Sequence, residues 1–77
     1  MAKEQAYEME SVHGPILVHI KHALGNLIPS SEVVDAIRSR LWHGAPHPGE
    51  THDTTAHIGS EDWTVTATNP ATPASDA

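Results

Sequence analysis

Histidines are the residues of this chain whose type and spacing come closest to a chemical site, and the sequence holds seven of them. His19 and His22 stand three residues apart, which would place both on one flank of a helix. Four more follow in a later segment: His43, His47, His52 and His57. Imidazole binds zinc, copper and nickel, but the sequence has no His-Glu-x-x-His motif and Pro46 would break a helix that joined two of these histidines. We therefore expect solvated or packing histidines, with no bound metal and no cofactor.

The sequence shows no catalytic motif of a known kind. Its serines lie at expected helix caps or in flexible segments, without a nucleophile elbow, and it has no Gly-rich phosphate loop. The absence of cysteine excludes thiol catalysis, thiolate metal sites and disulfides. The acidic pair Glu61-Asp62 falls in an expected loop with no pocket around it. We expect a protein that is not an enzyme.

Charge and hydropathy restrict the classes of partner. The formal net charge is −6 with only four Lys and Arg residues, which argues against sequence-independent binding to nucleic acid. The longest apolar run, Ile16 to Val18, is far shorter than the roughly 20 residues that cross a bilayer, so we expect no membrane partner. The first residues do not match a secretory signal peptide. The expectation is a soluble chain that is intracellular or assembled into a virion.

Residues 15–44 show the strongest periodicity and predict two amphipathic helices that pack as a hairpin. At 100° per residue, the apolar side chains of the first helix fall in one arc of about 140°. Ser30 or Ser31 then caps a second helix that runs to about His43. The expected hairpin core and interface comprise Ile16, Leu17, Ile20, Leu24, Leu27, Ile28, Val33, Val34, Ile37 and Leu41.

The rest of the chain is expected to add little regular structure. Residues 1–14 are a charged lead-in with some helix propensity, and residues 45–60 form a linker rich in His, Pro and Gly. Residues 61–77 form an extended arm with one strand over 63–68, where apolar side chains alternate with threonine. The predicted fold is therefore a small, mainly α protein: a helical hairpin followed by an extended C-terminal arm with one short β-strand.

Two short helices cannot enclose each other's apolar stripes, and a single strand has no partner inside such a chain. Both features predict that other protein subunits, or a second copy, complete the structure. Residues off the helical stripes or on the strand are the expected partner-binding set: Val18, Trp42, Trp63, Val65 and Ala67. For Trp42, a position covering the edge of the core is the alternative. The function expected is a non-enzymatic structural or accessory subunit of a larger assembly, such as a virion minor capsid or cement protein.

A second interpretation comes from Ser30 to Leu41, where a Ser-Glu-Val-Val run precedes an Ala-x-Arg pattern. This stretch resembles the second helix of ribbon-helix-helix antitoxins. The resemblance implies a small dimeric transcriptional regulator, with a first helix before this one and a C-terminal arm that wraps a toxin. The segment from Met1 to His13 departs from the family, because it is acidic where the family has a basic DNA-reading strand. DNA binding by this route is therefore the alternative function.

Overall fold

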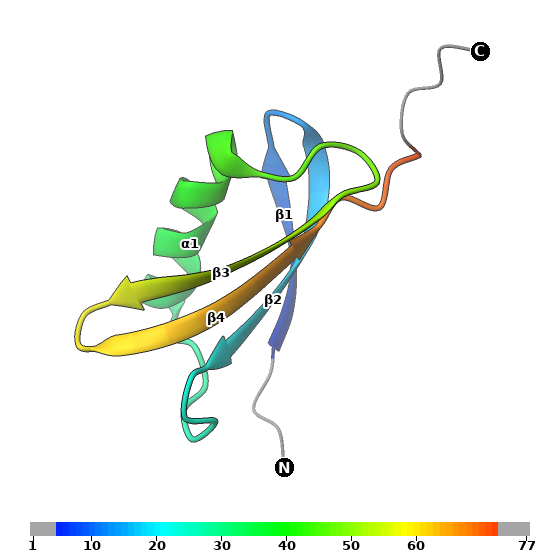
Figure 1. Cartoon of the computed structure of the whole chain (residues 1–77). Helices are drawn as coiled ribbons and strands as arrows, with labels where there is room; N and C mark the ends of the chain where they lie inside the picture. Colours follow the sequence, from blue (N-terminus) through cyan, green and yellow to red (C-terminus); the bar gives the residue numbers. More distant parts are fainter. Residues whose placement is uncertain (1–4, 73–77) are drawn as a thin grey trace.

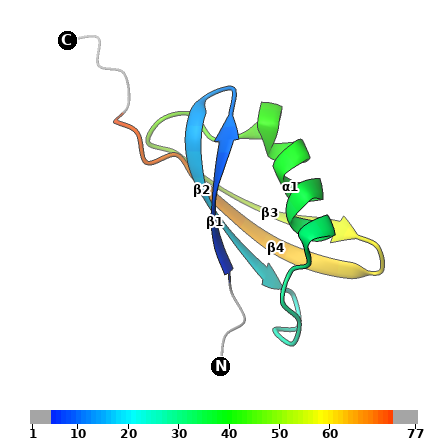
Figure 2. The ribbon, with the colours of Figure 1, turned by 180° about the vertical axis from the view of Figure 1, so that it is seen from behind.

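A computed structural model describes residues 5–72 as a four-stranded antiparallel sheet with one helix packed on one face (Figure 1). The elements are β1 (Gln5–Ser11), β2 (Gly14–His22), α1 (Ser31–Gly44), β3 (Thr51–Ile58) and β4 (Glu61–Thr68). The strands lie in the order β1-β2-β4-β3, so β1 and β3 form the two edges. The view from behind shows that α1 crosses the face of a twisted sheet (Figure 2).

Two hairpins build the sheet, and pairing between β2 and β4 joins them. The turn between β1 and β2 is Val12-His13, followed by Gly14 at a φ of 98°. The turn between β3 and β4 is Gly59-Ser60, with Gly59 at a φ of 64°. In the β3–β4 turn glycine holds the first central position, as type II′ hairpin turns prefer. In the β1–β2 turn Gly14 follows the two central residues, and glycine adopts its left-handed conformation without steric cost. The central pairing sets Ile20 of β2 opposite Val65 of β4.

The core lies between one face of the sheet and the apolar stripe of α1. Strand side chains alternate between the two faces, so every second residue of β2 and β4 points at the helix. The sheet contributes Met9, Ile16, Val18, Ile20, Ala56, Trp63, Val65 and Ala67 to this core. The helix contributes Val33, Val34, Ile37 and Leu41, and Ala45 completes the cluster. The opposite face of the sheet carries mainly threonine, histidine and charged side chains.

Helix α1 confirms the second predicted helix almost to the residue. Ser30 is its N-cap, and its hydroxyl accepts a hydrogen bond from the Val33 amide at 3.4 Å. All four residues of the predicted stripe, Val33, Val34, Ile37 and Leu41, are buried. The helix is thus specified by a local cap and by a 3.6-residue period that the tertiary structure does not oppose.

The first predicted helix is wrong, because residues 14–22 form strand β2 and the residues up to Ser30 form a loop. Ile16, Val18 and Ile20 point into the core, whereas Leu17 points to the other face. β-branched side chains have restricted χ1 rotamers in helices and pack well on a pleated sheet. The stretch fits a two-residue period as well as a helical one, and pairing on both sides with β1 and β4 selects the strand.

The mainly α fold class is corrected accordingly: over residues 5–72 the protein is mainly an antiparallel sheet with a single helix, without a helical hairpin. The expected lead-in contains β1, and the expected linker contains β3. The strand predicted over 63–68 exists within β4, but it pairs inside the chain, with β2 and β3. Residues 73–77 of the expected arm lie outside the described residues.

Candidate functional site

The structure separates the five residues expected to bind a partner. Val18, Trp63, Val65 and Ala67 are all buried in the protein's own core, with exposed fractions of 3% or less. Only Trp42 remains open to a partner, with 46% of its surface exposed near the end of α1. The strand residues are covered because β4 lies at the centre of the sheet, between β2 and β3, with α1 over one face.

A different group of large apolar side chains is exposed, in the loop between β2 and α1. Leu24 is 79% exposed, Ile28 is 58% exposed and Leu27 is 41% exposed. We call these three residues the loop patch. Sequence periodicity placed all three in the hairpin core, but the chain leaves the sheet after His22 and carries them away from the buried side chains.

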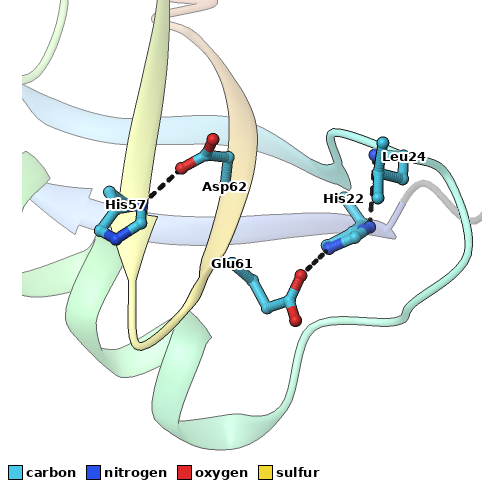
Figure 3. A network of polar contacts seen from close by, with 5 residues as sticks. All are labelled: His22, Leu24, His57, Glu61 and Asp62. Atoms are coloured by element: carbon cyan, nitrogen blue, oxygen red, sulfur yellow. Dashed lines mark hydrogen bonds and ion pairs between the residues drawn. The ribbon is translucent and has the colours of Figure 1, made fainter.

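His22 fixes the point where the loop leaves the sheet (Figure 3). It is the last residue of β2, and only 2% of its surface is exposed. Its Nε2 lies 2.6 Å from Oε1 of Glu61, the first residue of β4, and its Nδ1 accepts a hydrogen bond from the Leu24 amide at 3.3 Å. The imidazole therefore connects the start of the loop to the neighbouring strand.

These contacts identify the tautomer of His22. The Leu24 amide can only donate, so Nδ1 must present a lone pair. Nε2 then carries the hydrogen and donates a hydrogen bond to the Glu61 carboxylate. The ring also packs edge-on against Trp63, with centroids 5.0 Å apart and planes inclined by 73°. A buried polar side chain is thus hydrogen-bonded at both nitrogens, which is the condition for its burial without a large cost.

Backbone bonds hold the loop at both ends. The Ala23 amide donates to the Asp62 carbonyl at 2.9 Å, and the Gly25 amide donates to the His22 carbonyl at 2.9 Å. Gly25 has a φ of 76°, a left-handed conformation that other residues rarely adopt. At the far end Pro29 is buried and Ser30 caps α1. The loop patch therefore projects from a segment with fixed ends, which lowers the entropy that binding would remove.

Trp42 borders a second candidate surface on the exposed side of α1. A shallow depression of about 530 Å³ is lined by Asp35, Arg38, Ser39, Trp42 and His43. Every lining residue belongs to the same helix, and Arg38 forms an exposed ion pair with Asp35 at 2.6 Å. Small-molecule sites are concave and enclose most of the ligand surface. A depression lined by one helix offers a contact surface and no enclosing pocket.

The other histidines form pairs and do not converge on one point. The rings of His13 and His47 stack with centroids 4.1 Å apart, and His57 Nδ1 lies 2.6 Å from Asp62 Oδ1. His52 lies near Glu50, at 3.7 Å. Within residues 5–72, no three His, Asp or Glu side chains are placed to hold a metal ion. Over the same residues, no helix has the length and apolar character needed to cross a membrane.

Sequence reasoning missed both the loop patch and the role of His22. The signals were present: Gly25-Asn26 and Pro29 are turn residues that interrupt a helix, and His22 continues the alternation of Ile16, Val18 and Ile20. The apolar residues of this stretch also fit a helical period, and that period led to the prediction of a helix.

Comparison of the chain with protein-family models, curated proteins and solved structures finds no match.

Proposed function

We propose that this protein is a non-enzymatic accessory subunit that docks onto a larger protein assembly through the loop patch. The observation that carries the proposal is the exposure of Leu24, Leu27 and Ile28 on a loop whose ends are hydrogen-bonded to the sheet and helix. Small capsid and cement proteins are examples of this class.

Exposure of one leucine on a protein surface is ordinary, but exposure of three large aliphatic side chains within residues 24–28 of one loop is not. The core cluster of the described residues forms without these three side chains, so none of them belongs to it. Full burial of each against a partner would contribute roughly 1.5–3 kcal/mol. An apolar pocket or groove on the partner is the complement that this chemistry requires.

The surroundings of the loop patch favour a protein partner. Glu61 is half-exposed and contacts His22, whose other ring nitrogen bonds the Leu24 amide, so an acidic side chain lies where the loop begins. A hydrophobic centre with a polar rim is the common anatomy of protein–protein interfaces. The ribbon-helix-helix alternative has no such support, because the first helix that it requires is replaced by β2.

A photo-crosslinking amino acid at position 24 tests the proposal in the cells or particles that contain the protein. The expected result is one dominant, saturable adduct with a protein partner. The same amino acid at Arg40, an exposed position on α1 outside the depression near Trp42, is the matched control and should give no such adduct.

Binding to the purified partner then gives the decisive measurement. The double substitution Leu24→Ser and Ile28→Ser should weaken binding by roughly a hundredfold or more, because two aliphatic side chains no longer transfer out of water. Val12→Ser controls for loss of an exposed apolar side chain elsewhere and should leave binding within a few-fold of the original. Equal binding by the double variant and the original chain would rule out docking through the loop patch.

A further inference from the structure

Strand β3 is an open edge of the sheet. Among residues 5–72 it pairs with β4 on one side only, and Thr51, Asp53, Thr55 and His57 are all exposed. Even Thr54, which shares the helix side of the sheet with Ala56, is exposed, so α1 does not cover this edge completely. An edge strand presents a row of unpaired backbone donors and acceptors that can pair with another strand.

The ladder between β3 and β4 shows which backbone groups face outward. The Asn69 amide donates to the Glu50 carbonyl at 3.0 Å, in line with the register of the two strands. Hydrogen-bonded and non-hydrogen-bonded pairs alternate along an antiparallel ladder, so even-numbered residues of β3 bond to β4. The amides and carbonyls of Thr51, Asp53, Thr55 and His57 therefore point away from the sheet.

The two edges of the sheet differ in their protection against pairing. β1 carries the carboxylates of Glu8 and Glu10 on one face, and like charges across a strand pair are unfavourable. At its turn, the Val12 amide already donates to the Trp42 carbonyl at 3.0 Å. β3 has eight residues with a single carboxylate, and it contains neither lysine nor proline. The usual devices that block edge pairing are therefore missing from β3.

We propose that β3 pairs antiparallel with β3 of a second copy of this chain, about a two-fold axis at Thr55, to give a continuous eight-stranded sheet. In this register Thr55 faces Thr55 of the second copy, and the outward backbone groups of Asp53 meet those of His57. Both helices lie on the same side of the combined sheet, because the axis is perpendicular to it. The interface is isologous and closes on itself as a dimer.

Side-chain chemistry selects this register and a second copy as the occupant. Asp53 of each chain lies across from His57 of the other. The two-fold axis therefore creates two equivalent pairs in which a carboxylate faces an imidazole. His57 also contacts Asp62 of its own chain at 2.6 Å. It is then flanked by two carboxylates, one from each copy.

On the helix side, Thr54 faces Ala56 and half-buried His52 faces half-buried Ile58. These pairs cover the part of β3 that α1 leaves open.

The association state of the full chain tests the proposal directly. Sedimentation equilibrium should show a monomer–dimer equilibrium for the unaltered protein. Thr55→Pro should shift it to monomer by at least about a hundredfold in Kd, because proline removes the central amide donor without breaking a bond to β4. Asp53→Asn should weaken the dimer by up to about tenfold. A monomer at every accessible concentration, or an undiminished Thr55→Pro dimer, overturns the proposal.

A crosslink tests the register independently of whether Thr55→Pro folds. The chain has no cysteine, so Thr55→Cys introduces a unique thiol. Hydrogen-bonded antiparallel partners have Cα atoms about 5.5 Å apart, within the range of a disulfide. Mild oxidation should give a disulfide-linked dimer rapidly. Thr51→Cys is the control on the same strand and face, and its two copies would lie about 27 Å apart. Equal crosslinking at both positions would contradict the register.

The loop patch takes no part in this pairing, so the two proposals fail separately. A dimer that does not bind a partner through Leu24 would leave the β3 pairing intact. Partner binding by a strict monomer would remove the β3 pairing alone.

Discussion

Asn69 connects three segments that are distant in sequence. It is 1% exposed, and its amide nitrogen donates to the His13 carbonyl at 3.0 Å and to the Pro46 carbonyl at 3.2 Å. Its side-chain oxygen accepts a hydrogen bond from the Ala71 amide at 3.0 Å. The β1–β2 turn, the segment after α1 and the end of β4 therefore meet on one side chain. A buried amide that uses both of its donors and its acceptor holds these segments in register.

Asn69→Ala should lower the free energy of unfolding by about 2–4 kcal/mol, because at least two carbonyls lose their donor. Asn69→Asp should cost more at neutral pH, since a carboxylate would then face two carbonyl oxygens. Urea unfolding monitored by circular dichroism measures both. Ser39→Ala, on the exposed side of α1, is the control and should change stability by less than about 0.5 kcal/mol. If Asn69→Ala matched this control, the network around Asn69 would not contribute to stability.

Helix α1 is the element whose structure is most local in origin. Its cap, its stripe and its first-turn acid Glu32 all lie within the helix or next to it. Ser30 supplies both its hydroxyl to the Val33 amide and its carbonyl to the Val34 amide. The next residue, Ser31, is exposed and has no such bond among those of the described chain. Only one serine of this pair therefore caps the helix.

Ser30→Ala should reduce the free energy of unfolding by roughly 0.5–1 kcal/mol, and Ser31→Ala should leave it nearly unchanged. Chemical denaturation of the two variants side by side gives the comparison. Since the two serines are adjacent and chemically identical, any general effect of removing a hydroxyl cancels. A larger loss for Ser31→Ala would mean that the helix begins one residue later.

The fold of the whole molecule depends on pairing between its N-terminal and C-terminal hairpins. β2 comes from the N-terminal hairpin and β4 from the C-terminal hairpin, and their pairing places both at the centre of the sheet. Helix α1, which lies between the hairpins in sequence, covers side chains from both. Neither hairpin alone would have a covered face. An isolated two-stranded hairpin without such cover is at best marginally stable. The unit that folds is therefore the complete sheet with its helix.

A pair of substitutions separates this fold from the helical hairpin that the sequence predicts. A helical hairpin buries both Ile20 and Leu24, whereas the structure buries Ile20 completely and leaves Leu24 79% exposed. Ile20→Ala should therefore cost about 2–5 kcal/mol, and Leu24→Ala less than about 0.5 kcal/mol. Thermal and urea unfolding of both variants provide the measurement. Comparable losses at the two positions would be inconsistent with the sheet.

Local sequence patterns correctly predict the parts of the protein that short-range chemistry specifies. A serine cap and a helical stripe identified α1, and alternation of threonine with apolar residues identified the strand from Trp63 to Thr68. The same local patterns wrongly placed four core residues in the expected partner-binding set. The helix and the strand were identified because their signals lie within a few residues of one another.

Pairing between strands that are distant in sequence fixes the rest of the fold and the candidate surfaces. Residues 15–28 satisfy a helical period and, up to His22, a strand period, and only β1 and β4 on either side select the strand. The same pairing buries Val18, Val65 and Ala67, exposes the loop patch and leaves β3 at an open edge. A strand gains most of its free energy from neighbours that the local sequence does not specify. The candidate surfaces therefore follow from the sheet order, which local patterns do not encode.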